Sequence, residues 1–169
     1  IESVSVPLSE AQKAYRSING ELRESLEVAS SRIKHFQERS LPENWKDENQ
    51  GYGQNFLPVA SAGAYIPGGT ACYPSTVLMT AIPAKVAGVS NFSIASPALN
   101  GGLPHQSVLA AAHIAGVDNI YTMGGPHAIA ALAFGSESVL PVDVICGPGN
   151  VFVTMAKKLV YGQVGIDGL

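Results

Sequence analysis

Residues 59–95 read VASAGAYIPGGTACYPSTVLMTAIPAKVAGVSNFSIA, and the pattern of this stretch decides the fold class. Two short apolar runs, at 59–66 and 90–95, are separated by a longer segment of helical character at 74–87. Apolar strands that alternate with helices are typical of a parallel sheet with helices on both faces. Pro83 lies inside the helical segment, and we expect it to kink that helix or to end it early.

The same alternation continues along the rest of the chain. It predicts strands at 119–123 and 142–146 and helices at 104–115, 126–134 and 150–161. We therefore expect residues 56–169 to form a Rossmann-like domain of the α/β class, a doubly wound parallel sheet with helices on both faces.

Residues 1–55 have a different pattern. Ser9 opens a helix capping-box pattern, and Asn19 can cap a second helix. The apolar residues that follow recur at steps of three and four, as on one face of a helix. We expect a helix pair over 9–40 and then a polar linker at 41–55, which separates this helical segment from the second unit.

The composition of the 169-residue chain excludes several classes of protein. Its length suits one domain, with room for a small second one. Hydrophobic residues make up 46% and charged residues 14% of the chain, and the net charge is -3. These values exclude a disordered protein, a coiled coil and a basic nucleic-acid-binding surface, and no run approaches the ~18 apolar residues of a membrane span. Cys72 and Cys146 have no metal-binding spacing, and we interpret them as reduced thiols of a cytoplasmic protein.

Charged residues are unevenly distributed along the chain. Residues 1–50 hold seven Lys or Arg and nine Asp or Glu, whereas residues 51–169 hold only three and four. A domain surface that faces water normally carries more charge than that. We infer that another subunit or further polypeptide covers part of the surface of 51–169. The alternative is an unusually Ala- and Gly-rich small domain.

Three glycine clusters follow predicted strands: PGGT at 67–70, GGPH at 124–127 and GPGN at 147–150. In a doubly wound sheet these positions lie at the carboxyl ends of the strands, beside helix N-termini that favour phosphate groups. The clusters therefore favour a nucleotide-binding crevice, although glycines at such positions can also be ordinary turn and cap residues. Neither the GxGxxG fingerprint with its acidic partner nor a GxxxxGK loop is present, so any nucleotide site differs from the usual ones.

Three side chains beside these clusters are candidate ligand contacts. Tyr65 ends the first strand, where an aromatic ring could stack on a base or a ribose. His127 opens a helix at the edge of the crevice. Asn150 opens the last helix, and its amide suits either an N-cap or a ligand contact. The other candidates have structural interpretations: His105 and His113 pack or lie on the surface, Glu137 is a cap or surface charge, and Asp143 supports its strand.

Several strings of the sequence carry a resemblance to a known family. They are AYIPGGT at 64–70, STVLM at 75–79, GGPHAIAALAFG at 124–135 with ESV at 137–139, GPGN at 147–150 and AKK at 156–158. In this order they closely resemble histidinol dehydrogenases. The resemblance covers nearly all of this chain but somewhat less than half of a family chain.

The resemblance implies an enzyme that oxidises L-histidinol to L-histidine through the aldehyde in two NAD-dependent steps, the last step of histidine biosynthesis. It also implies zinc dependence, a homodimer and a cytoplasmic location. The family's NAD contacts carry over to Tyr65, His127 and Asn150. The family usually has Gln in place of His127, and an imidazole cannot donate and accept at one point as an amide does, so we expect altered NAD affinity.

The resemblance further implies that the family's zinc ligands, its Glu–His catalytic pair and its substrate-binding residues follow the stretch that matches Gly165–Asp167, downstream of Leu169. We therefore expect no catalytic residue and no metal ligand in this chain, weak NAD binding or none, and no dehydrogenase activity from the chain alone. Two alternatives stay open. One is a stand-alone module that binds a nucleotide or a partner, and the other is a related dehydrogenase of another amino or sulfonated alcohol.

Overall fold

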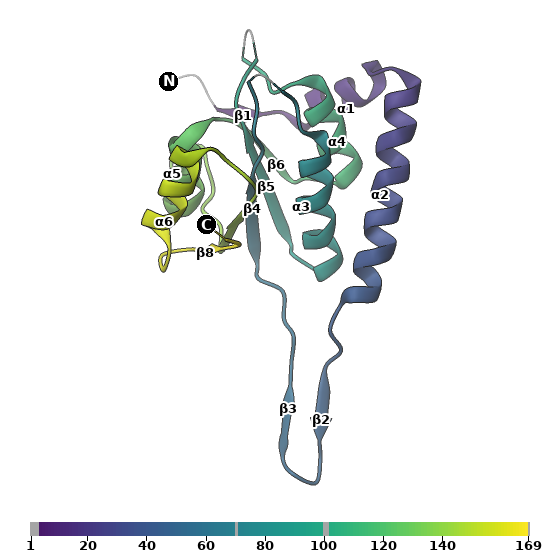
Figure 1. Cartoon of the computed structure of the whole chain (residues 1–169), viewed down its shortest axis with the longest axis vertical. Helices are drawn as coiled ribbons and strands as arrows, with labels where there is room; N and C mark the ends of the chain where they lie inside the picture. The colour runs from purple at the N-terminus through teal and green to yellow at the C-terminus, as the bar shows by residue number, and fades with distance from the viewer. Residues whose placement is uncertain (1–3, 70, 100–101, 169) are drawn as a thin grey trace.

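A six-stranded sheet forms the centre of the molecule in a computed structural model, which describes residues 4–69, 71–99 and 102–168 (Figure 1). Neighbouring strands are parallel, except that the first strand of the order below is antiparallel to its neighbour. Across the sheet the order is β1 (Ser5–Val6), β6 (Asn119–Thr122), β5 (Asn91–Ser96), β4 (Ser61–Tyr65), β7 (Val144–Cys146) and β8 (Gly165–Ile166).

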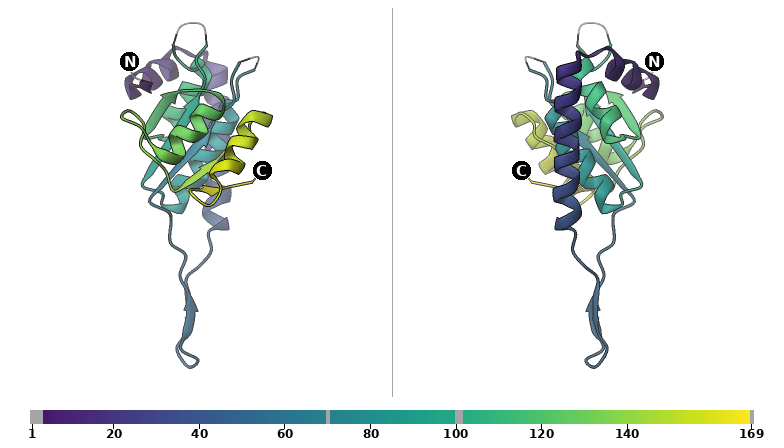
Figure 2. Two further views of the ribbon diagram at one scale, coloured as in Figure 1. Left: turned by 90° about the vertical axis from the view of Figure 1, so that its left-hand side faces the viewer. Right: turned by 90° about the vertical axis from the view of Figure 1, so that its right-hand side faces the viewer.

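Helices cover both faces of this sheet (Figures 1 and 2). On one face lie α3 (Pro74–Ala87) and α4 (Gln106–Ala115), with α1 (Leu8–Ser17) packed on α4 and α2 (Gly20–Ser40) on α3; on the other face lie α5 (Gly125–Phe134) and α6 (Val151–Val160). This arrangement confirms the predicted class, an N-terminal helix pair followed by a doubly wound parallel sheet. Within the described ranges, no helix combines the length and the apolar character needed to cross a membrane.

Each face of the sheet has its own hydrophobic core. Phe92 and Ile94 of β5 pack into the core beneath α3 and α4. Ala95, next along the same strand, packs on the opposite side with Leu132 and Ile145, in the core beneath α5 and α6. Successive side chains of a strand point to opposite faces, so a strand buried on both faces needs a continuous apolar run. That requirement explains why only the small, buried Ser93 interrupts the apolar residues from Phe92 to Ala95.

The predicted elements of 59–161 fall within two residues of the observed ones. Of the two outcomes expected for Pro83, an early end is wrong, because α3 continues through Pro83 to Ala87. Proline lacks the N–H that would bond to the carbonyl four residues earlier, which belongs to Met79. Met79 is 66% exposed, so water can replace the lost bond on that side of the helix.

The start of α1 also differs from the prediction. The helix begins at Leu8, after Pro7, and no side chain caps it. Ser9 therefore lies inside the first turn, and the predicted capping box is wrong. The prediction for Asn19 is confirmed, because its side chain accepts a hydrogen bond of 2.7 Å from the N–H of Leu22 at the start of α2.

The middle of the expected linker forms a β-hairpin that projects from the body of the molecule (Figures 1 and 2). Its two strands are β2 (Trp45–Asp47) and β3 (Tyr52–Gln54), which pair antiparallel. The Trp45 and Tyr52 rings meet edge to face with centroids 6.0 Å apart. Strands of three residues are too short for an alternating pattern, so the sequence offered no signal for this hairpin.

Candidate functional site

The topology brings the three glycine clusters to one edge of the sheet. After β4 the chain crosses to β5 by α3 on one face, whereas after β7 it continues into α6 on the other face. β4 and β7 are neighbours, so the chain leaves two adjacent strands in opposite directions. Doubly wound folds bind ligands in the crevice outside the carboxyl ends of the strands at such a switch point.

Close backbone packing joins the loops at this carboxyl edge. Gly147 has φ +101°, and a Cβ added there would lie 2.3 Å from the carbonyl oxygen of Tyr65. Only glycine fits that position without a shift of the backbone. Gly68 and Gly124 both pack on Pro97, with added Cβ atoms 2.7 Å and 2.9 Å from its ring carbons. The edge is therefore built by close contacts that exclude side chains at selected points.

Tyr65 lies at the end of β4 and is only 5% exposed. Its hydroxyl accepts a hydrogen bond of 3.1 Å from the N–H of Gly125, the first residue of α5. The side chain thus links the end of β4 to the start of α5 at the carboxyl edge. The burial of the ring gives Tyr65 a supporting role in this structure, and its contact with a cofactor stays a prediction.

His127 lies in the first turn of α5 and is exposed. Gly125, two residues earlier, has φ +64°, which turns the chain into the helix. Within the described part of the chain, the imidazole has no hydrogen-bond or ion-pair partner. Both ring nitrogens are therefore accessible to a ligand at the carboxyl edge.

Asn150 is the N-cap of α6. Its side-chain oxygen accepts hydrogen bonds of 3.1 Å from the N–H groups of Phe152 and Val153. The predicted N-cap is thereby confirmed. Only the side-chain NH₂ of the amide is left for a ligand. Tyr65 thus ends β4, and His127 and Asn150 follow β6 and β7 at the same edge. No direct contact among these three side chains occurs in the described structure.

The remaining polar candidates have structural contacts. His105 caps α4, because its Nδ1 accepts from the N–H of Ser107 at 3.2 Å. The ring of His113 lies 5.0 Å from that of Tyr15. Asp143 accepts hydrogen bonds from the N–H and the hydroxyl of Ser61, at 2.7 Å and 2.9 Å, and these bonds hold the pKa of the Asp143 carboxyl below its ordinary value.

Sequence reasoning missed a cluster beneath the third glycine loop. Lys157 of α6 donates to Asp167 and to the carbonyl oxygen of Gly147, at 2.6 Å in each case. Asp167 also accepts from the N–H of Gly147 at 2.9 Å. Burial raises the pKa of the neighbouring Cys146 thiol to about 12; Asp167 adds to this shift and Lys157 opposes it. The helical register could have revealed this lysine, because Lys157 lies four residues after Val153 and therefore on the same buried side of α6.

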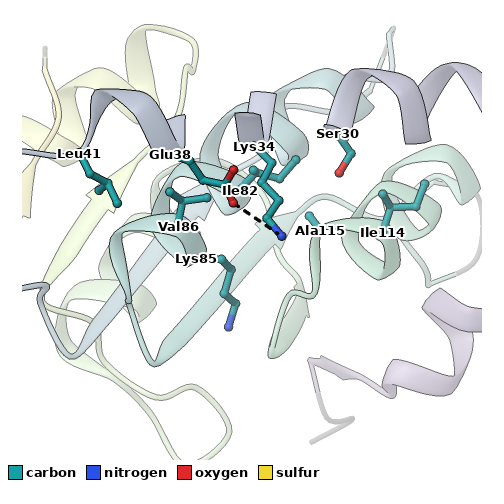
Figure 3. A pocket seen from close by; sticks show the side chains of 9 residues that line it. All are labelled: Ser30, Lys34, Glu38, Leu41, Ile82, Lys85, Val86, Ile114 and Ala115. Atoms are coloured by element: carbon teal, nitrogen blue, oxygen red, sulfur yellow. Dashed lines mark ion pairs between the residues drawn. The ribbon is translucent and has the colours of Figure 1, made fainter. Parts of the chain in front are cut away.

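Two hollows of the surface lie towards opposite ends of the parallel strands. A cleft of about 390 Å³ adjoins the third glycine loop and is lined by Gly147, Pro148, Gly149, Thr154, Lys157, Asp167 and Gly168. A cavity of about 430 Å³ lies between α2, α3 and α4, towards the amino ends of the strands (Figure 3). Its charged groups already have partners: Lys34 pairs with Glu38 at 3.9 Å and Lys85 with Asp118 at 2.5 Å. The carboxyl edge, with its accessible imidazole and open loops, is the better candidate site.

A metal site does not form among the described residues. No three His, Cys, Asp or Glu side chains in the described ranges are grouped so that they could hold an ion. Leu169, downstream of which we expect the catalytic residues and the zinc ligands, lies outside the described residues, so that expectation stays a prediction. The chemistry available at the carboxyl edge is that of hydrogen-bond donors and helix N-termini, which suits binding of an anionic or nucleotide-like molecule.

Comparison with known proteins relates this architecture to one family. The family model described as histidinol dehydrogenase matches residues 1–169. A histidinol dehydrogenase of Parasynechococcus marenigrum is 51% identical over 99% of this chain, which spans 39% of that protein. One of Haloarcula marismortui is 49% identical over 94% of this chain and 38% of that protein. The crystal structure of histidinol dehydrogenase from Elizabethkingia anophelis superposes with a TM-score of 0.92 at 33% identity, over 99% of this chain and 40% of that one.

Proposed function

Because this chain belongs to the histidinol dehydrogenase family, we propose that it forms the NAD-binding side of an NAD-dependent histidinol dehydrogenase. That enzyme oxidises L-histidinol to L-histidine through the aldehyde, as the last step of histidine biosynthesis. The observation that carries the proposal is the convergence of three glycine loops at the carboxyl edge, which includes the β4–β7 switch point. In this proposal residues 56–169 are the NAD-side domain, and residues 1–55 are a helical segment with a hairpin in its linker.

The carboxyl edge has the features that a dinucleotide requires. Gly69 has φ +118° and Gly125 has φ +64°, and a Cβ added at either would meet nothing within 4 Å among the described residues. The backbone is thus open to close approach at both loops. The N-termini of α5 and α6 face the same edge, and the positive ends of their helix dipoles favour phosphate oxygens. These residues fit NAD.

NAD supplies the hydride acceptor when it is bound, and the residues of this chain bind and orient it. The Asn150 NH₂ donates a hydrogen bond while its oxygen keeps α6 capped. The His127 imidazole offers a second polar contact at the start of α5. Tyr65 holds that start in place through the N–H of Gly125. The first turn of α5 is thereby tied to the end of β4.

Zinc does not fit the residues described here, because they contain no group of three potential ligands. We derive no step through zinc, and we propose that the chain alone is catalytically incomplete, with the reacting groups supplied from downstream of Leu169. An assay of histidinol-dependent NADH formation by the purified chain tests this directly. The proposal expects no turnover above the buffer rate, and measurable turnover would overturn it.

His127 provides a sharper test of the NAD contact. Replacement of His127 by Gln restores an amide that donates and accepts at one point, so NAD affinity should rise. The gain of about one hydrogen bond corresponds to a several-fold decrease in Kd. His113→Gln in the last turn of α4, away from the carboxyl edge, is the matched control and should leave Kd unchanged. Equal affinities in all three proteins would remove His127 from the proposed site.

The surface of α6 supports a larger assembly. Val151, Met155 and Leu159 follow one another at steps of four and are 65%, 51% and 81% exposed. Apolar faces of this kind normally contact other protein. We propose that further polypeptide or a second subunit covers this face, in a cytoplasmic homodimer. The chain spans 39% of the curated relative from Parasynechococcus marenigrum.

The second candidate is a stand-alone binding module, which the two well-formed cores favour. Light scattering separates the two proposals. A module should be a monodisperse monomer, whereas a part of a larger enzyme should dimerise or aggregate through the α6 face. Leu159→Lys should abolish that association without a loss of stability, because Leu159 is 81% exposed. The remaining alternative is a related dehydrogenase that acts on another amino or sulfonated alcohol. Assays of the complete enzyme with each alcohol test it.

A further inference from the structure

Side chains bind both backbone polar groups of Gly147, its N–H and its carbonyl oxygen. Its N–H donates to Asp167 Oδ2 at 2.9 Å, and its carbonyl oxygen accepts from Lys157 Nζ at 2.6 Å. The ring closes between the two side chains, where Lys157 Nζ donates to Asp167 Oδ1 at 2.6 Å. The glycine that follows β7 is therefore tied at once to α6 and to the residue after β8.

The burial of Lys157 makes this ring unusual. Its side chain is 6% exposed, and no other charged residue among those described is buried. Its neighbours on the same side of α6, Val153 and Val160, are apolar and buried. A buried ion pair is often no more stabilising than apolar residues of similar volume. Packing alone does not call for a lysine here, so its role concerns the conformation that it specifies.

That conformation is the path of the loop from β7 to α6. Gly147 has φ +101° and lies against the carbonyl oxygen of Tyr65. Pro148 follows with a φ fixed by its ring. Asn150 then caps α6, the same helix that carries Lys157. The loop is thus fixed at its first residue by Lys157 and Asp167 and at its last by the helix cap.

We propose that Lys157 and Asp167 are a positioning pair that holds the glycine loop in the shape in which Asn150 meets NAD, an inference that rests on the proposed function. The two side chains touch neither cofactor nor substrate in this proposal. They act through Gly147, whose orientation sets where the Asn150 amide and the first N–H groups of α6 lie. Without the pair, the loop samples other conformations, and NAD binding is weakened by the entropy lost when the loop is ordered.

The test compares Lys157→Gln and Asp167→Asn with Lys158→Gln, a matched control that removes the same charge from the next, exposed residue of α6. Two quantities are measured by NMR on the whole chain: the hydrogen-exchange rates of the Gly147 and Val153 amides, and the Kd for NAD from a titration into the millimolar range. Melting temperatures show whether each variant folds. If Lys157→Gln does not fold, Asp167→Asn still tests the pair, because Asp167 is half-exposed and its substitution disturbs the core less.

The proposal expects about tenfold faster exchange of the loop amides and about tenfold weaker NAD binding in both variants, and no change in Lys158→Gln. The double variant should be no worse than the single ones, because both side chains act through one ring. Unchanged exchange would overturn the proposal. Faster exchange with unchanged Kd would also overturn it, since the pair would then serve stability alone. A wild-type chain that shows no NAD shifts would contradict the proposed function instead, and the exchange rates would still decide whether the pair holds the loop.

Discussion

The two edges of the sheet use the same kind of contact for different purposes. At the amino edge, Asp118 accepts from the N–H of Phe92 at 2.6 Å, and Asp143 accepts from that of Ser61 at 2.7 Å. Each carboxylate ties the start of one strand to its neighbour. At the carboxyl edge, Asp167 makes the equivalent contact with Gly147, but the residues beyond form an exposed glycine loop.

This difference indicates which edge is built for stability and which for binding. The carboxylates of the amino edge have partners within the protein, Lys85 for Asp118 and Ser61 for Asp143. The charged pair of the carboxyl edge holds a loop that leaves His127 and the Asn150 NH₂ accessible. Substitutions at the amino edge should therefore change stability alone, whereas those at the carboxyl edge should also change the loops that we propose bind NAD.

The largest expected effect comes from Gly147→Ala. The new methyl would overlap the Tyr65 carbonyl oxygen at 2.3 Å and would occupy a φ of +101°. We expect the free energy of unfolding to fall by about 3–5 kcal/mol, from strain and overpacking together. Gly162→Ala is the control, because Gly162 has φ +92° with nothing within 4 Å, and it should cost only about 1–2 kcal/mol. Equal losses in urea denaturation would contradict the close packing of the carboxyl edge.

The next effect is the dependence of stability on pH through Cys146. Its folded pKa of about 12 exceeds the ordinary value of 9.0, so the folded protein keeps a proton that the unfolded chain releases. The stabilisation is complete below pH 9 and is lost as the pH rises towards 12, by up to about 4 kcal/mol. Urea denaturation from pH 8 to pH 10.5 should show a steeper decline for the wild type than for Cys146→Ala. Parallel declines would show that the thiol is not held neutral.

Asp118→Ala should cost about 1–3 kcal/mol, because it removes two hydrogen bonds and leaves Lys85 without its partner. The control Glu38→Ala breaks an exposed pair with N···O 3.9 Å and should cost less than about 1 kcal/mol. The NMR signals of the three glycine loops should be unchanged in both variants. Shifts in those loops on loss of Asp118 would mean that the two edges are coupled.

The smallest effect is expected for Tyr65→Phe, which removes the acceptor of the Gly125 N–H. The cost in stability should be about 1 kcal/mol, and exchange of the Gly125 amide should accelerate. Tyr121→Phe is the matched control, because the Tyr121 hydroxyl accepts from the N–H of Leu140 at 3.3 Å, away from the loops. A change at Gly125 in both variants would show that the effect is general loosening rather than loss of the Tyr65 bond.

The sequence was sufficient for the main fold because buried parallel strands need predominantly apolar runs, and these recur between helical stretches. It was insufficient for β1, β8 and the hairpin, because their strands have two or three residues and, unlike β7, lie in no longer apolar run. The capping box at Ser9 failed because the helix already begins at Leu8, directly after Pro7. Lys157 was missed because a lysine beside Lys158 resembles a surface residue unless the helical register is taken into account.

The candidate site could likewise be predicted from the sequence only in part. The topology of a doubly wound sheet brings Tyr65, His127 and Asn150 to one edge, as their positions after predicted strands indicated. The burial of the Tyr65 ring depends on packing across the sheet, and the bond to Gly125 joins residues 60 positions apart, so neither was visible in the sequence. Contact of these side chains with NAD stays a prediction.

The assignment of NAD to the carboxyl edge is tested most directly by an NMR titration of the ¹⁵N-labelled chain with NAD into the millimolar range. We expect weak binding, with amide shifts at the loops that contain Gly69, Gly125 and Gly149 and at the first turns of α5 and α6. Residues around the cavity between α2 and α3 should not shift. Shifts confined to that cavity, or no shifts at the three loops, would contradict the assignment of the carboxyl edge as the NAD-binding side.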